Sequence, residues 1–164
     1  MSGIKIFISH QQQDSTTAIA VEKHLKTRYG IECYLDVIDT NLTRGEEIAD
    51  YVRKELDKCS HLLVVVSKAT KGSWWVPWEI GVATEKDYPM ASFGSQVELP
   101  EFLLMWPYLQ DLNDLDRYAE TVQQTYVSRK VGGLEHYTSE SAAAAVGVSG
   151  TKQFYKNLRS KLGQ

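Results

Sequence analysis

The sequence predicts an α/β protein with an open, parallel sheet of about five strands and helices on both faces of the sheet. Short apolar stretches alternate along the chain with longer segments whose apolar residues recur at helical spacing. Residues 62–66 are aliphatic at every position, so both faces of that strand must be buried, as in the middle of a parallel sheet. The 164 residues suffice for one domain with its own core.

Two strands and two helices are predicted in the first third of the chain. Residues 4–8 are largely β-branched and apolar, as strands are, and residues 31–35 are predicted as a second strand. Between them, Asp14 is expected to cap a helix, because its carboxylate can accept from the free N–H groups of the first turn. Gly30 is expected to end that helix. A polar loop at 36–45 then leads to a second amphipathic helix with acids in its first turn.

The later elements are less regular. Pro77 fits the first turn of a third helix. Three apolar segments follow: a weak strand candidate at 89–93, a buried element of unassigned type at 99–106, and a long helix at 112–126. In the remainder, Gly132-Gly133 and residues 142–150 indicate loop, and a last helix carries an apolar stripe of Tyr155, Leu158 and Leu162. We therefore expect one domain at 1–126 and a C-terminal helical extension at 127–164.

Composition and charge exclude several classes of protein. The net charge is −3, and 19 acidic residues against 12 basic ones in 1–126 argue against a nucleic-acid module. The longest aliphatic run has five residues, far short of the roughly 20 that cross a bilayer. Cys33 and Cys59 lack the spacing of metal ligands, and no apolar run marks a signal peptide. We expect a cytoplasmic protein with reduced thiols, no metal, and neither nucleic acid nor membrane as partner.

Polar side chains follow the predicted strands where each strand ends. Ligands of open α/β sheets bind beyond the carboxyl ends of the strands, near the point where the strand order reverses. The candidates there are Ser9 and His10 after the first strand, Asp36 after the second, Ser67 after the central one, and Trp75 and Glu79 at the start of the third helix. A hydroxyl, an imidazole, two carboxylates and an aromatic ring could therefore converge on one site.

Other well-known sites are missing from the sequence. No glycine-rich dinucleotide or P-loop pattern follows a strand, and no H-E-x-x-H or G-x-S-x-G occurs. A phosphate-accepting receiver domain would carry acids at the end of the first strand, where this chain has Ser9 and His10.

The order of several segments is that of a known family. Ile6-Phe7-Ile8-Ser9-His10 resembles the opening strand of Toll/interleukin-1 receptor (TIR) domains. Residues 36–39, followed by Leu42 and Gly45, resemble the family's BB loop, and residues 73–80 resemble its W-x-x-x-E segment. Residues 60–67 are similar to the family's central strand. The resemblance covers residues 4–126 and implies a flavodoxin-like sheet. His10 and the segment at 89–93 depart from the usual pattern.

The resemblance implies an activity. Enzymatic TIR domains break the bond between nicotinamide and ribose in NAD⁺ and need the glutamate of the W-x-x-x-E segment, which here is Glu79. NAD⁺ would be the substrate, with no further cofactor. Ser9, His10, Asp36 and Trp75 are the expected substrate contacts. The attacking group would set the product: water gives ADP-ribose, adenine gives a cyclic ADP-ribose, and another nucleophile gives a conjugate.

Simpler roles remain open for the same residues. Glu79 could be an acid favoured near a helix start by the helix dipole, and Trp75 could be a core anchor. Asp36 could hydrogen-bond its own loop. Lys68 and Lys71 could meet a diphosphate or be solvated.

Two further functions remain open for the whole chain. It could be a non-enzymatic TIR module that acts by homotypic assembly, or an enzyme similar to nucleoside 2-deoxyribosyltransferases, which use a similar sheet and a glutamate nucleophile. Under the enzymatic hypothesis, we expect copies of the chain to assemble through TIR–TIR contacts. The resemblance also implies a diffusible signal read by a separate effector, as in Thoeris-type antiphage systems.

Overall fold

The computed structural model describes residues 3–35, 45–68, 70, 75–85, 87–95, 97–99, 101–135 and 140–164. Side chains within these ranges are described except at 45, 46, 75, 76, 78, 85, 102, 127–135 and 140–149.

Five strands form one parallel sheet in the order β2-β1-β3-β4-β5, which confirms the predicted fold class. The strands are β1 (Lys5–Ser9), β2 (Glu32–Leu35), β3 (His61–Val65), β4 (Met90–Phe93) and β5 (Tyr108–Leu109). The chain runs from β1 outward to β2, and then from β3 outward through β4 to β5. The strand order therefore reverses between β1 and β3, which is where a ligand site is expected.

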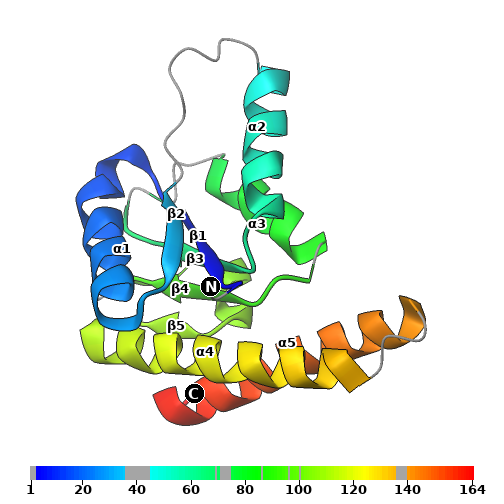
Figure 1. Ribbon diagram of the computed structural model, residues 1–164. Coiled ribbons are helices and arrows are strands. Elements are labelled where there is room, and N and C mark those ends of the chain that lie inside the picture. The colour runs from blue at the N-terminus through cyan, green and yellow to red at the C-terminus, as the bar shows by residue number, and fades with distance from the viewer. Residues whose placement is uncertain are drawn as a thin grey trace.

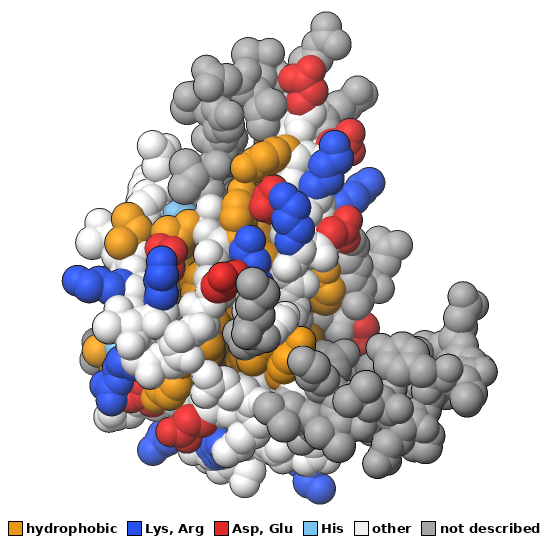
Figure 2. Space-filling view, in the orientation of Figure 1, with side chains coloured by type: hydrophobic (Ala, Val, Ile, Leu, Met, Phe, Trp, Pro, Cys, Tyr) orange, Lys and Arg blue, Asp and Glu red, His pale blue; other side chains and the backbone are white. Residues whose placement is uncertain are grey.

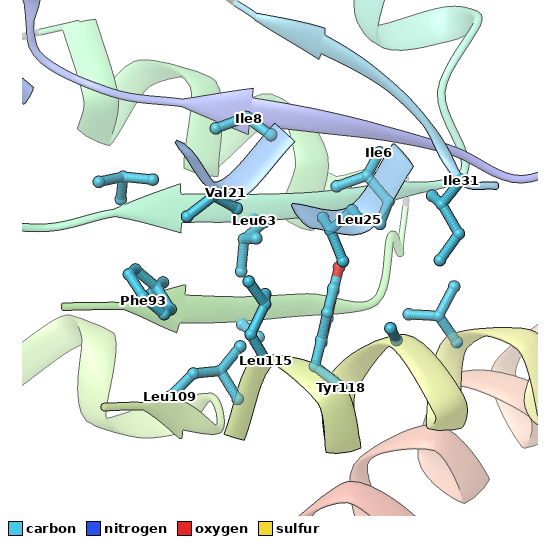
Figure 3. Close-up of a cluster of buried hydrophobic side chains, with 14 of the residues drawn as sticks. Ile6, Ile8, Val21, Leu25, Ile31, Leu63, Phe93, Leu109, Leu115 and Tyr118 are labelled. Atoms are coloured by element: carbon cyan, nitrogen blue, oxygen red, sulfur yellow. The ribbon is translucent and has the colours of Figure 1, made fainter. Parts of the chain in front are cut away.

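Helices cover both faces of the sheet (Figure 1). They are α1 (Ser15–Tyr29), α2 (Gly45–Asp57), α3 (Trp75–Glu85), α4 (Leu112–Glu135) and α5 (Glu140–Leu162), with short 3₁₀ helices η1 (Gln12–Asp14) and η3 (Glu101–Met105). One core lies between the sheet and α1, α4 and α5, and Figure 3 shows part of it, with Leu25 and Tyr118 facing the sheet. A second core lies on the opposite face, under α2 and α3.

The structure confirms most of the predicted elements. Residues 62–66, which form most of β3 and the position after it, are all buried, as their aliphatic character requires. Gly30 ends α1 with a φ of 64°, a conformation that glycine adopts without a steric penalty. The weak candidate at 89–93 is the buried strand β4. The unassigned segment at 99–106 contains η3.

The prediction that the Asp14 side chain caps α1 is wrong. Asp14 stands at the N-cap position but makes no side-chain hydrogen bond to the helix. Its φ of −98° and ψ of 9° place it in the turn of η1, outside the extended backbone conformation from which a capping side chain usually reaches back. Its carboxylate instead accepts a hydrogen bond from Ser67 Oγ at 2.8 Å.

The loop predicted at the glycines and alanines of residues 132–150 is also wrong. α4 continues through Gly132-Gly133 to Glu135, and α5 already begins at Glu140. A glycine inside a helix costs only about 1 kcal/mol relative to alanine, a penalty that packing of a helix against a neighbour can exceed. The two helices lie side by side (Figure 1).

The second half of α5 packs against the end of the sheet where the strands begin. Phe154 and Leu158 are fully buried, and the Phe154 ring meets the edge of His61 at the start of β3, with the ring centroids 5.6 Å apart. Tyr155 Oη accepts a hydrogen bond from Met90 N at the start of β4, at 3.0 Å. The helix therefore lies at the amino ends of the strands, away from the edge that carries the predicted site.

The described helices are ordinary in hydropathy, and the surface over α2 is ordinary in charge. None of the helices in the described part of the chain is long and apolar enough to cross a bilayer. On the face seen in Figure 2, acidic and basic side chains are intermixed over the region of α2. Among the described residues of that region, such mixing produces no extended field of one sign.

Candidate functional site

Ser9 and Glu79 meet where the strand order reverses. Ser9 is the last residue of β1, and Glu79 is the fifth residue of α3, 70 positions further along the chain. The Ser9 hydroxyl donates a hydrogen bond to Glu79 Oε2. Both residues are fully buried, at 0% exposure. Two residues that the sequence predicts for one site are therefore in direct contact.

The position of α3 explains why Glu79 reaches this edge. α3 follows β3 and leads into β4, so its first turns stand beyond the carboxyl end of β3. Ile80 and Ala83 are buried in the core under α2 and α3, and they fix the rotation of the helix. The amino end of a helix carries partial positive charge, which favours a carboxylate close to it.

His10 and Asp14 continue the chain along the same edge. His10 is 8% exposed and directly follows Ser9, and its Nδ1 lies 3.4 Å from the Ile8 carbonyl oxygen. Asp14 is 9% exposed and is held by Ser67, the second residue after β3. This second contact joins the loop after β1 to the loop after β3, on either side of the reversal point.

Thr70 stabilises the loop after β3. Its Oγ1 accepts a hydrogen bond from Ser67 N at 2.9 Å, and its own N–H donates to the Ser67 carbonyl oxygen at 3.1 Å. Sequence reasoning treated Asp14 as a helix cap and missed Thr70. The available signal was position, because each lies in a segment that directly follows a predicted strand.

The arrangement suits a reaction that develops positive charge. A carboxylate enclosed by protein interacts with a nearby cation more strongly than it would in water. The two thiols are poor candidates for nucleophiles, because burial raises the pKa of both Cys33 and Cys59 to about 12. In the described part of the chain, no three His, Cys, Asp or Glu residues group in a way that could hold a metal ion.

Other predicted residues are placed only in part. Asp36 and Lys71 lie outside the described residues. Trp75 opens α3, but its side chain is not among those described. Lys68 is exposed. The structure thus brings together Ser9, His10 and Glu79, and it adds Asp14 to the same edge.

Comparison with known proteins identifies the family to which this chain belongs. The TIR domain family model matches residues 6–99, more than half of the chain and the part that holds Ser9 and Glu79. The chain belongs to the TIR domain family, which confirms the resemblance seen in the sequence.

Two similar proteins add detail. A Bacillus cereus (strain MSX-D12) protein named "Probable 3′ cyclic ADP-D-ribose synthase ThsB′" is 26% identical over 115 residues, or 63% of this chain. The match spans 59% of that protein's own length. The crystal structure of the TIR domain of the Toll-related receptor TRR-2 from Hydra magnipapillata superposes with a TM-score of 0.53. At 15% identity, over 80% of this chain and 98% of that one, it shows a shared fold alone.

Proposed function

We propose that this protein cleaves the bond between nicotinamide and ribose in NAD⁺, with Glu79 as the catalytic residue. The observation that carries the proposal is the fully buried Glu79 carboxylate, hydrogen-bonded by Ser9 at the point where the strand order reverses. The match to the TIR family covers this residue. The ThsB′ relative, whose name refers to cyclic ADP-ribose synthesis, supports the same class of chemistry.

The chemistry needs one carboxylate and no general acid. Nicotinamide leaves a cationic pyridinium as a neutral molecule, so no proton has to be supplied to it. The ribose passes through an oxocarbenium-like transition state, as in glycoside hydrolysis. A fixed carboxylate next to the ribose stabilises the positive charge that develops there, and it can accept hydrogen bonds from the sugar hydroxyls.

Substrate contacts come from the same edge of the sheet. His10 directly follows Ser9 at the carboxyl end of β1, and its proposed role is a contact with the substrate. Asp36 and Trp75 remain predicted contacts, the first after β2 and the second at the start of α3. Water, adenine or another nucleophile would complete the reaction and set the product. The name of the relative favours a cyclic ADP-ribose.

The proposed setting is antiphage immunity in bacteria. The product would act as a diffusible nucleotide signal for a separate effector protein, and copies of the chain would assemble through TIR–TIR contacts. This setting rests on the resemblance of the sequence to the TIR enzymes of Thoeris-type antiphage systems, and the relative named as a cyclic ADP-ribose synthase agrees with a nucleotide product.

Product analysis tests the proposal. The purified protein is incubated with NAD⁺ at several concentrations, with and without a crowding agent, and the nucleotides are identified by mass spectrometry. We expect free nicotinamide together with a linear or cyclic ADP-ribose. Intact NAD⁺ under every condition would support the non-enzymatic assembly module. Exchange of bases on 2′-deoxynucleosides, with NAD⁺ left intact, would support the hypothesis of a deoxyribosyltransferase-like enzyme.

A further inference from the structure

A carboxylate at 0% exposure must have donors, because removing an ionised group from water costs several kcal/mol unless hydrogen bonds replace the lost hydration. Ser9 supplies such a donor to Glu79 Oε2. The hydroxyl is itself fully buried, so it faces the carboxylate from inside the protein.

Ser9 is held more rigidly than the group it binds. β1 pairs with β2 on one side and with β3 on the other, and Ser9 lies opposite Val64 in that register. The serine side chain has a single carbon–carbon torsion to fix its oxygen, whereas a glutamate has three torsions to restrict. A hydroxyl fixed by the middle of the sheet can therefore define where the Glu79 carboxylate lies.

We propose that Ser9 is a positioning residue, whose hydroxyl holds the Glu79 carboxylate in the orientation that the reaction uses. This inference rests on the proposed function and assigns to Ser9 a role other than the substrate contact expected from the sequence. A side chain that orients a reacting group changes the rate of the chemical step more than the affinity for substrate.

The structure offers a matched control in the same row of the sheet. Ser92 on β4 lies opposite Val64, which in turn lies opposite Ser9, so all three side chains point to the same face. Ser92 is also buried, at 1% exposure. Ser9→Ala and Ser92→Ala therefore remove the same hydroxyl from two equivalent buried positions, only one of which bonds Glu79.

The first test compares wild type, Ser9→Ala, Ser9→Thr and Ser92→Ala for nicotinamide release from NAD⁺, with thermal unfolding of each. We expect Ser9→Ala to lower kcat about 10–100-fold, the range known for groups that orient metal ligands, with KM changed less than about threefold. Ser9→Thr keeps the hydroxyl and should recover most of kcat. Ser92→Ala should keep kcat and KM within about twofold of wild type.

Two kinetic results would overturn the inference. A raised KM with unchanged kcat in Ser9→Ala would make Ser9 a substrate contact. Equal losses of kcat in Ser9→Ala and Ser92→Ala would mean that any buried serine in this row matters only for packing. Because both are deletions of one oxygen, this comparison remains decisive even if the added methyl group of Ser9→Thr prevents folding.

A second test does not depend on turnover. The carboxyl carbons of ¹³C-labelled glutamates are titrated by NMR in wild type and Ser9→Ala, with Glu79→Gln identifying the Glu79 signal. Loss of a donor to the ionised form should move the titration midpoint of that signal to higher pH. The other ionisable side chains placed at this edge are His10, Asp14 and Lys68, and all three are kept in both proteins. An unmoved midpoint would overturn the inference.

The two tests separate the two ideas. If the wild type releases no nicotinamide, the proposed function is contradicted. If the Glu79 midpoint nevertheless moves in Ser9→Ala, the hydrogen bond from Ser9 to Glu79 is supported. Normal wild-type turnover with an unchanged Ser9→Ala would contradict the positioning role while leaving the proposed function standing.

Discussion

Asp116 on α4 connects that helix to α1 through polar contacts with two side chains. Its Oδ1 lies 2.6 Å from His24 Nε2 and accepts a hydrogen bond from Tyr29 Oη at 2.8 Å. The bond with His24 is the main cause that lowers the pKa of the Asp116 carboxyl from its ordinary value, and the Tyr29 bond adds to it. The ionised carboxylate is therefore the form that holds the two helices together.

This lowered pKa predicts a pH dependence of stability. A carboxyl whose pKa is lower in the folded than in the unfolded state stabilises the fold above the unfolded pKa, and that contribution is lost as the pH falls through the folded value. Asp116→Asn should therefore lower the free energy of unfolding at neutral pH and reduce its decline on acidification. Urea unfolding between pH 3 and pH 7 measures both effects. Glu120→Gln, at an exposed carboxylate of the same helix, is the control, and an equal loss of the pH dependence in both variants would contradict the role of Asp116.

Two glycines should respond to alanine with opposite signs. A Cβ at Gly94, just after β4, would lie 2.6 Å from Val66 Cγ2 and 2.7 Å from the Val66 carbonyl oxygen, so Gly94→Ala should cost about 1–3 kcal/mol. Gly81 lies inside α3 with nothing within 4 Å of its added Cβ, so Gly81→Ala should stabilise by about 0.5–1 kcal/mol. Chemical denaturation of both variants gives the comparison. Equal and small changes would show that Gly94 and Val66, the residues that follow β4 and β3, do not approach as closely as this.

The role of a residue could be predicted where its immediate neighbours in the sequence determine that role. Gly30 was correctly expected to end α1, because a left-handed residue after a helix favours glycine. Asp14 has two meanings, since the same carboxylate can cap a helix or accept a bond from a distant loop. The partner that decides, Ser67, is 53 positions away and becomes visible only in the fold.

At the level of elements, the sequence predicted the strands β1 to β4 and the periodic helices, but neither β5 nor the helical state of the glycines and alanines at 132–133 and 142–150. β5 has only two residues, too few to show any alternation, and it forms because β4 offers it a parallel edge. The glycines and alanines at 132–150 lack an apolar stripe of their own, so their helical state depends on the pairing of α4 with α5.

The docking of α5 should contribute strongly to stability. Phe154 is fully buried and makes edge contacts with His61, Tyr118 and Tyr155. Phe154→Ala should lower the free energy of unfolding by about 3–5 kcal/mol, since it removes a large ring from a packed core. Lys156→Ala, two residues on and exposed, is the control and should change it by less than about 0.5 kcal/mol. Equal effects of the two would indicate that α5 does not dock in solution.

At the scale of the whole molecule, the fold class followed from the alternation of elements, and the site followed from the topology. The edge where strands end is fixed once the sheet is known to be parallel, so Ser9 and Glu79 could be assigned to one site from the sequence. Their direct contact could not, because it depends on the rotation of α3 over the sheet.

Assembly is the remaining property of the whole molecule that we predict. If copies pair through TIR–TIR contacts to complete the site, turnover per molecule should rise with protein concentration or with a crowding agent. Nicotinamide release measured beside light scattering tests this. A rate strictly proportional to concentration over a wide range, from a protein that stays monomeric throughout, would contradict it.

The most direct test of the central claim is the loss of one charge at Glu79. Nicotinamide release is compared in wild type, Glu79→Gln and Glu85→Gln, each checked by circular dichroism. Glu85 is the last residue of α3, about 240° further round the helix, and receives the same substitution as a control. We predict that Glu79→Gln lowers turnover at least about 10²–10³-fold with the fold intact, and that Glu85→Gln turns over like wild type. Wild-type turnover in Glu79→Gln would contradict the account, because the buried carboxylate would then have no part in the reaction.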